Sequence, residues 1–298
     1  TIGGSNVFIG YRSGYNNTGR RITSPTVDTL GSRNVFLGYE AGFSNTTGAD
    51  NVLLGFQAGY GVTIAGNNIS IGSNAGFQNT NNSDNIFLGR EAGYNHTGDG
   101  STNSAINNIF IGLQAGYGHS VNGNQGNNNV FLGTQSGYSN RGGTANVFIG
   151  ELTGYSNISG NSNVFIGYYS GYNNDGTLGM QYGNNNVFVG NAAGFSNDHG
   201  YENVFLGYAA GYANTDGIHN VFLGYNTGDN NRSGYDNTFI GTESGTDIQS
   251  GNWNTFLGCY AGQYAVAGNQ NIFVGVSSGS YHRSGNDNVY LGNSAGLG

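Results

Sequence analysis

The chain has 298 residues, of which 57 are glycine and 48 asparagine, together with 21 tyrosines and 17 phenylalanines, a single cysteine (Cys259) and no lysine, and its formal net charge is −8. A collagen triple helix is excluded because there is one proline and no Gly-X-Y period, and long helices are disfavoured by the Gly and Asn content. The acidic balance argues against a nucleic-acid partner, and no apolar run reaches the roughly 18 residues of a membrane helix, so we expect no membrane insertion.

A five-residue motif recurs along the whole chain: Asn, then usually Val or Ile, Phe, Ile or Leu, and Gly. Eleven of the fifteen spacings between copies are 17 residues, and the others are 28, 23, 21 and 23. We number the positions of the repeat as columns, with the motif Asn as column one. Its sixteen copies begin at Asn6, Asn34, Asn51, Asn68, Asn85, Asn108, Asn129, Asn146, Asn163, Asn186, Asn203, Asn220, Asn237, Asn254, Asn271 and Asn288. Such a period is the signature of a repeat architecture.

Each copy of the motif predicts a short strand that ends in a turn, beginning with residues 7–9 and ending with 289–291. A second strand is predicted on columns eight to ten, as at 58–60, and the Asn, Thr, Gly and Asp residues that follow predict a longer turn. The predicted fold is all-β, a parallel β-solenoid or β-roll of sixteen mostly 17-residue coils, stacked about 4.8 Å apart.

The repeat predicts one continuous domain in which the residue type of column ten changes part-way along the chain. Column ten is Tyr or Phe throughout residues 1–228, whereas residues 229–298 continue the same solenoid without aromatic residues in that column. All insertions follow column ten, and the one at residues 18–33, with Arg20, Arg21 and Pro25, is predicted to be a decoration or contact loop. The array is expected to continue beyond both ends of these residues.

Side chains of columns two and four point to one side of their strand and column three to the other. We expect Val204 and Leu206 to face the inside of the coil with Ala210, and Phe205 to face outward. Because an exposed row of thirteen Phe is too large an apolar stripe for a soluble monomer, the Phe ladder is predicted to pack against another chain or against a third wall of the same coil.

Four invariant or nearly invariant columns are interpreted as structural ladders. The column-one Asn has two readings, an internal amide ladder or a ligand site, and the ladder is favoured because every copy carries it. The Gly columns are expected to supply positive φ or close approach of backbones. The predicted ladder residues are Asn6, Asn34, Asn51, Phe8, Phe36, Phe87, Phe110, Phe131, Gly10, Gly14, Gly38 and Gly42.

Catalytic, cofactor-binding and metal-binding residues are not predicted. Three histidines, His96, His119 and His282, stand in column twelve, usually Asn, and are interpreted as turn substitutions. A glycan-cleaving β-helix would need acidic residues on neighbouring coils, but the nearest candidates lie in separated coils: Glu40, Glu91, Glu151 and Glu243. Ice binding would need a regular, paired array of Thr on a flat face, whereas column thirteen is Thr in only some of the coils, so ice binding is disfavoured.

The motif Asn6-Val7-Phe8-Ile9-Gly10, with its small residue and Gly in columns eight and nine, resembles the head repeats of trimeric autotransporter adhesins. It is also similar to repeat regions of bacterial and phage tail-fibre-domain proteins. The resemblance implies a left-handed parallel β-roll in which three chains pack around an axis, although the repeat here is longer than in that family and Phe replaces its small third residue.

The sequence therefore favours a structural fibre or filament segment with an adhesive role, extracellular or at the cell surface, and without cofactors. Expected partners are further copies of the chain, as a homotrimer or filament, and a host-surface or glycan receptor. The alternatives are a phage-type tail fibre, a carbohydrate-acting enzyme, which is the least favoured, and a glycan-binding module that uses the column-six tyrosines Tyr11, Tyr39, Tyr208 and Tyr225.

Overall fold

The computed structural model describes residues 4–18, 30–97, 105–118, 126–175 and 182–297. Within these residues it confirms an all-β parallel solenoid, with one three-residue strand in each of the sixteen repeats and no helix. The predicted contact-loop residues Arg20, Arg21 and Pro25 lie outside the described residues.

The chain forms two compact units, Thr1–Asn146 and Val147–Gly298. The first unit holds β1 (Val7–Ile9), β2 (Val35–Leu37), β3 (Val52–Leu54), β4 (Ile69–Ile71), β5 (Ile86–Leu88), β6 (Ile109–Ile111) and β7 (Val130–Leu132). The second holds β8 (Val147–Ile149), β9 (Val164–Ile166), β10 (Val187–Val189), β11 (Val204–Leu206), β12 (Val221–Leu223), β13 (Thr238–Ile240), β14 (Thr255–Leu257), β15 (Ile272–Val274) and β16 (Val289–Leu291).

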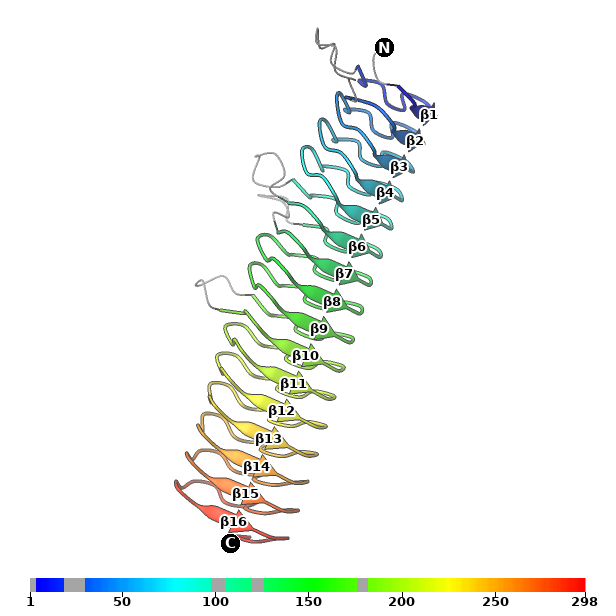
Figure 1. Ribbon diagram of the computed structural model, residues 1–298. Coiled ribbons are helices and arrows are strands. Elements are labelled where there is room, and N and C mark those ends of the chain that lie inside the picture. Colours follow the sequence, from blue (N-terminus) through cyan, green and yellow to red (C-terminus); the bar gives the residue numbers. More distant parts are fainter. Residues whose placement is uncertain (1–3, 19–29, 98–104, 119–125, 176–181, 298) are drawn as a thin grey trace. The chain divides into compact units, whose positions relative to one another are not determined.

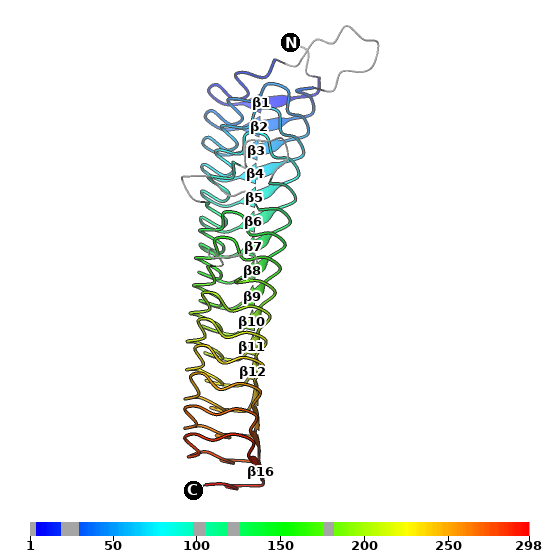
Figure 2. The same ribbon diagram turned by 90° about the vertical axis from the view of Figure 1, so that its left-hand side faces the viewer.

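Within each unit the strands pair in parallel and in sequence order, column against column (Figure 1). Between β11 and β12, for example, Phe205 lies opposite Phe222 and Leu206 opposite Leu223. Figure 2 shows the same order from the side, with one strand and its turns in each coil. Because the register never slips, each column becomes a row of equivalent side chains.

The predicted second strand on columns eight to ten is wrong, because columns six to eleven form a turn. Column seven is left-handed in every coil without being Gly, and column nine is a left-handed Gly, as at Gln57 (φ 51°) and Gly59 (φ 56°). Two such residues bend the chain away from the extended geometry of a strand. The turn is still hydrogen-bonded from coil to coil, since Gly42 N–H donates to Ala58 O at 3.0 Å and Ser44 N–H to Tyr60 O at 3.0 Å.

The predicted orientation of the strands is also wrong: the Phe column faces the interior, and columns two and four face outward. Phe205 is fully buried, whereas Val204 and Leu206 are half-buried. The cause is column nine, where the missing side chain of Gly211 leaves the space that the Phe205 ring fills. The ladder is therefore covered by another wall of its own coil, the second predicted alternative, and needs no other chain to bury it.

The Phe ladder forms a nearly continuous interior stack. Ring centroids are 4.8 Å apart between Phe205 and Phe222 and 4.6 Å between Phe256 and Phe273, which matches the spacing of hydrogen-bonded strands. Burying each ring contributes about 1.5–3 kcal/mol. The rings below 2% exposure are Phe36, Phe87, Phe110, Phe131, Phe148, Phe165, Phe188, Phe205, Phe222, Phe239, Phe256 and Phe273, whereas Phe8 in the first coil is 36% exposed.

The stack is interrupted once, at Leu53 and Ser70, which occupy the Phe column of two successive coils. Ser70 is fully buried, and its hydroxyl has no hydrogen-bond partner among the described residues. On the far side of this gap, Phe87 and Phe110 are tilted by 31° with centroids 5.5 Å apart, in place of the parallel stacking seen elsewhere. An unpartnered buried hydroxyl destabilises a fold, so this position is a weak point of the core.

Gly137→Ala tests the role of column nine. An added Cβ would lie 2.5 Å from ring carbons of Phe131 at a residue with φ +59°, so we expect a loss of about 2–4 kcal/mol in the free energy of unfolding by urea titration. The control is Gly142→Ala in the same coil, where a Cβ would meet nothing within 4 Å; it should change stability by less than about 0.5 kcal/mol. Equal effects of the two changes would contradict the packing described here.

Ser70→Ala removes the unpartnered hydroxyl and should raise the free energy of unfolding by about 1 kcal/mol in thermal or urea denaturation. The matched change is Ser244→Ala, because the buried Ser244 hydroxyl donates to Phe256 O and Ala261 O, each at 3.3 Å. That change should lower stability. If both substitutions destabilise to the same extent, the buried Ser70 hydroxyl has a partner in solution.

Candidate functional site

The column-one asparagines form an amide ladder through the interior. In the third coil, Asn51 donates its backbone N–H at 3.0 Å and its Nδ2 at 3.2 Å to Oδ1 of Asn34, and Nδ2 also donates to the Ala65 carbonyl of its own coil at 2.9 Å. The pattern begins at Asn6, whose Oδ1 accepts the Asn34 N–H at 2.8 Å. These side chains are fully buried from Asn34 onward, 2% exposed at Asn271 and half-buried at Asn288, so the bonds form an internal ladder of amides.

A second asparagine ladder runs along column twelve and was not predicted. Asn214 Nδ2 donates to Asn197 Oδ1 at 2.7 Å and to the Gly217 carbonyl at 3.0 Å. Asn203 of column one donates to the same Gly217 carbonyl at 2.8 Å. The two ladders are thus joined in each such coil by one carbonyl of column fifteen. The repeated Asn of column twelve was the available signal, although Asn is equally typical of turns.

His96 replaces Asn in this second ladder. It is fully buried, its Nε2 lies 3.0 Å from the Ala105 carbonyl, and its ring meets Phe87 and Phe110 edge to face at 5.0 and 5.6 Å. Burial lowers the pKa of His96 to about 4, against a smaller opposing effect of the Ala105 hydrogen bond. His282 lies half-buried in the same column near Asn288 and Tyr290, and His119 is outside the described residues.

The glycine columns have two different tasks. Gly14 and Gly42 of column nine both have φ +59° and lie against the rings of Phe8 and Phe36. Gly10 and Gly38 of column five have φ +128° and +140°, and a Cβ on either would run into the column-five carbonyl of the next coil. Both predicted reasons for invariant glycine, positive φ and close approach of backbones, therefore operate.

The acidic candidates for carbohydrate hydrolysis are not paired with one another. Glu40 accepts from Gln57 Nε2 at 2.9 Å, Glu91 from Gln114 at 2.7 Å, and Glu243 from Gln263 at 2.6 Å. Glu151 lies on the exposed column six. Among the described residues, no group of three or more His, Cys, Asp or Glu is placed to hold a metal ion.

The surface aromatic columns are themselves stacked. In column ten, Phe43 and Tyr60 lie 5.0 Å apart, and the row ends at Tyr212, after which Asp229 takes the place of a ring. Burial, and to a smaller extent Asp247, raises the pKa of Asp229. In column six, Tyr11 stacks on Tyr39 at 5.2 Å, as Tyr208 does on Tyr225. In column six, Tyr39 has a ring against each face, Tyr11 and Phe56. Tyr208 and Tyr225 are the two ends of their own stack and are 51% and 48% exposed, so stacking removes Tyr39 as a sugar platform and covers one face of the others.

Three threonines of column thirteen use their hydroxyls in hydrogen bonds within the solenoid. Thr46 and Thr63 donate their hydroxyls to carbonyls of the following coil, Thr63 O and Thr80 O, at 3.1 and 3.0 Å, and Thr215 donates to Arg232 O at 2.9 Å. Hydroxyls bound to their own backbone do not form a free hydroxyl array. The geometry adds nothing in favour of ice binding.

The outward face of the strands is an exposed apolar surface in each unit. Columns two and four contain only Val, Ile and Leu, apart from Thr238 and Thr255, and no charged residue. In the second unit, Val221 is 37% exposed, Leu223 42% and Leu257 43%. Contiguous apolar surface on this scale is typical of interaction surfaces. Sequence reasoning missed it because it had assigned these columns to the interior.

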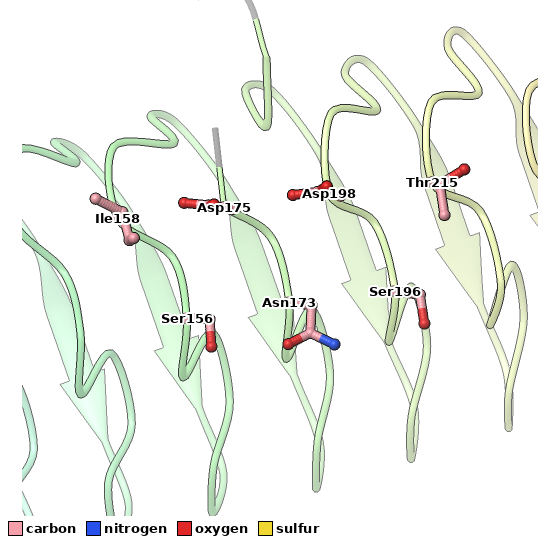
Figure 3. Close-up of a pocket in the computed structure, with 7 residues that line it drawn as sticks. All are labelled: Ser156, Ile158, Asn173, Asp175, Ser196, Asp198 and Thr215. Atoms are coloured by element: carbon pink, nitrogen blue, oxygen red, sulfur yellow. The ribbon is translucent and has the colours of Figure 1, made fainter. Parts of the chain in front are cut away.

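A polar groove of about 520 Å³ crosses the long turns of the second unit. Figure 3 shows its lining side chains in two rows, one from column eleven and one from column thirteen. They are Ser156, Asn173 and Ser196 in the first row and Ile158, Asp175, Asp198 and Thr215 in the second. Hydroxyl, amide and carboxylate groups face one another there, but no nucleophile and base are brought together.

No protein-family model, curated protein or solved structure matches this chain. Among the described residues, no helix has the length and apolar character needed to cross a membrane. The outward apolar face and the ladders behind it are therefore the observations from which function must be argued.

Protonation of His96 should make stability depend on pH. Because its folded-state pKa of about 4 lies below the ordinary 6.5, the unfolded chain takes up the proton first. The contribution of the neutral His96 to the free energy of unfolding is complete above about pH 6.5. It is lost as the pH falls toward 4, and the loss is on the order of 3 kcal/mol. Urea titrations from pH 7 to pH 4 should show this loss in the wild type and not in His96→Asn, which restores the ladder residue.

The matched control is His282→Asn, a change in the same column at a half-buried position. It should leave the pH dependence of the wild type in place. A wild-type profile that His96→Asn does not alter would contradict the buried neutral imidazole.

Proposed function

We propose that this chain is a segment of an extracellular structural fibre with an adhesive role, in which solenoids associate side by side through their outward strand faces. The observation that carries the proposal is the uncharged surface of columns two and four, which the chain's own residues leave half-exposed, as at Leu37 (46%) and Leu223 (42%). Parallel sheets are usually covered on both faces, and here the inner face is covered by the column-eight and column-nine turn while the outer face is bare.

A second copy is the partner that fits this face best. Its aliphatic columns repeat at the same coil spacing, so the side chains of one copy can sit between those of another along the whole length of a unit. The resemblance to trimeric adhesin repeats supports a homotrimer, in which each strand face turns toward a common axis. The interior Phe ladder takes no part in this contact, because its rings are already buried.

The internal bonding supports a mechanical role. The column-one asparagine ladder links successive coils within a unit, and the column-twelve ladder and the Phe stack add contacts in many of them, so that stretching the stack would break many bonds together. The chain has no lysine and eight arginines, which leaves few cleavage sites for proteases that recognise basic residues. A shaft of this kind would present its turns and grooves to a host-surface receptor.

Sedimentation velocity at micromolar concentration tests the assembly. We expect the wild type to sediment as a trimer and Leu206→Glu/Leu223→Glu, which places charges on the strand face, to sediment as a monomer with an unchanged circular dichroism spectrum. Ser250→Glu, an exposed position in the long turn, should remain trimeric. A monomeric wild type, or a double variant that assembles normally, would refute the proposed contact.

A further inference from the structure

A second groove in the second unit combines aromatic rings with carboxylates. It has a volume of about 490 Å³ and is lined by Tyr182, His199, Tyr201, Asp216 and Ile218. These residues occupy columns fourteen and sixteen of three successive coils, on the long turn. The groove is therefore separate from the strand face on which the proposed assembly depends.

The rings of this groove are arranged differently from the stacked surface columns. Tyr182 meets His199 at 5.2 Å with an interplanar angle of 73°, and Tyr201 meets His219 at 5.6 Å and 83°. Edge-to-face pairs leave ring surface uncovered that face-to-face stacks do not. Tyr182 is 39% exposed, so the groove offers aromatic ring surface to a ligand beside its carboxylates.

The acidic side chain of the groove is held in place by its neighbours. Asp216 Oδ1 lies 2.9 Å from His199 Nδ1, and Asp216 Oδ2 accepts from the Thr215 hydroxyl at 3.1 Å. Asp198 Oδ2 lies 3.4 Å from the same histidine nitrogen. A carboxylate has about four acceptor positions, so Asp216 can still accept hydrogen bonds from ligand hydroxyls while its orientation is fixed.

The same combination continues along the next coils. His219 lies 3.2 Å from Glu202 through Nε2 and 3.2 Å from Asp236 through Nδ1. Beyond it, Tyr235 and Trp253 meet edge to face at 4.9 Å, and Trp253 is 51% exposed. Rings and oriented carboxylates thus recur coil by coil, which favours an elongated ligand with repeating units.

We propose that this groove binds a neutral oligosaccharide. The apolar C–H faces of the sugar rings would pack on Tyr182 and Tyr201, and their hydroxyls would donate to Asp216. Acidic sugars would be repelled by Asp198 and Asp216. A simple cation is a poorer match, because the described residues form no closed aromatic cage around the space.

Isothermal titration calorimetry of the whole chain with cellotetraose and tetra-N-acetylchitotetraose tests the proposal, with tetragalacturonate and tetramethylammonium as comparison ligands. At least one neutral tetrasaccharide should bind in the micromolar to millimolar range, as expected for a shallow groove, and the comparison ligands should bind at least tenfold more weakly. Absence of binding by both neutral sugars, or preferential binding of either comparison ligand, would overturn the proposal.

Variants locate the site. Tyr201→Ala and Asp216→Asn should each weaken the neutral sugar at least fivefold, whereas Tyr201→Phe, which keeps the ring, should bind as the wild type does. The matched control Tyr225→Ala removes an exposed but stacked ring outside the groove and should have no effect. Binding that survives Tyr201→Ala and Asp216→Asn would place the sugar elsewhere. These outcomes do not depend on oligomeric state, so they are independent of the proposed fibre assembly.

Discussion

The column-one asparagine amide is the interaction on which the remaining structure depends. Its Oδ1 accepts both the backbone N–H and the Nδ2–H of the next asparagine, while its own Nδ2 reaches a carbonyl of the long turn, as in Asn203 and Asn220. One side chain thus closes its own coil and ties it to a neighbour. Since the amide is buried, removing it would leave backbone donors and acceptors without partners.

This bonding allows a backbone that would otherwise be unfavourable. Each of the first fifteen coils holds two non-glycine residues with left-handed φ, in columns seven and seventeen, including bulky ones such as Leu152, Tyr169 and Trp253. Each such residue costs on the order of 1 kcal/mol or more. The Phe stack and the two amide ladders offset this cost, and the tight turns in return bring column nine against the Phe ring.

The solenoid, the positions of the motif strands and the parallel register were predictable from the spacing of the motif, whereas the second strand predicted on columns eight to ten does not form. Which face of the strand is buried was not predictable. The alternation of side chains along a strand shows which columns share a face, but it does not show which of the two faces points into the core. The deciding signals were present in particular residues. Thr238 and Thr255 in column two indicate solvent, and invariant Gly in column nine leaves room for a ring. The repeated Asn of column twelve was a signal for the second ladder, whereas the groove at Tyr201 and Asp216 depends on contacts between turns that a column pattern does not reveal.

The most direct test of the amide ladder is hydrogen exchange of asparagine side-chain amides, followed by NMR after transfer of the protein to D₂O. Exposed Nδ2 protons exchange rapidly, whereas buried and hydrogen-bonded ones exchange only when the coil opens. We expect a set of strongly protected side-chain amide signals, assigned to columns one and twelve, that decay together with the backbone amides of the strands. If all asparagine side-chain signals disappear at once while the strand amides stay protected, the coils are held together by something other than this ladder.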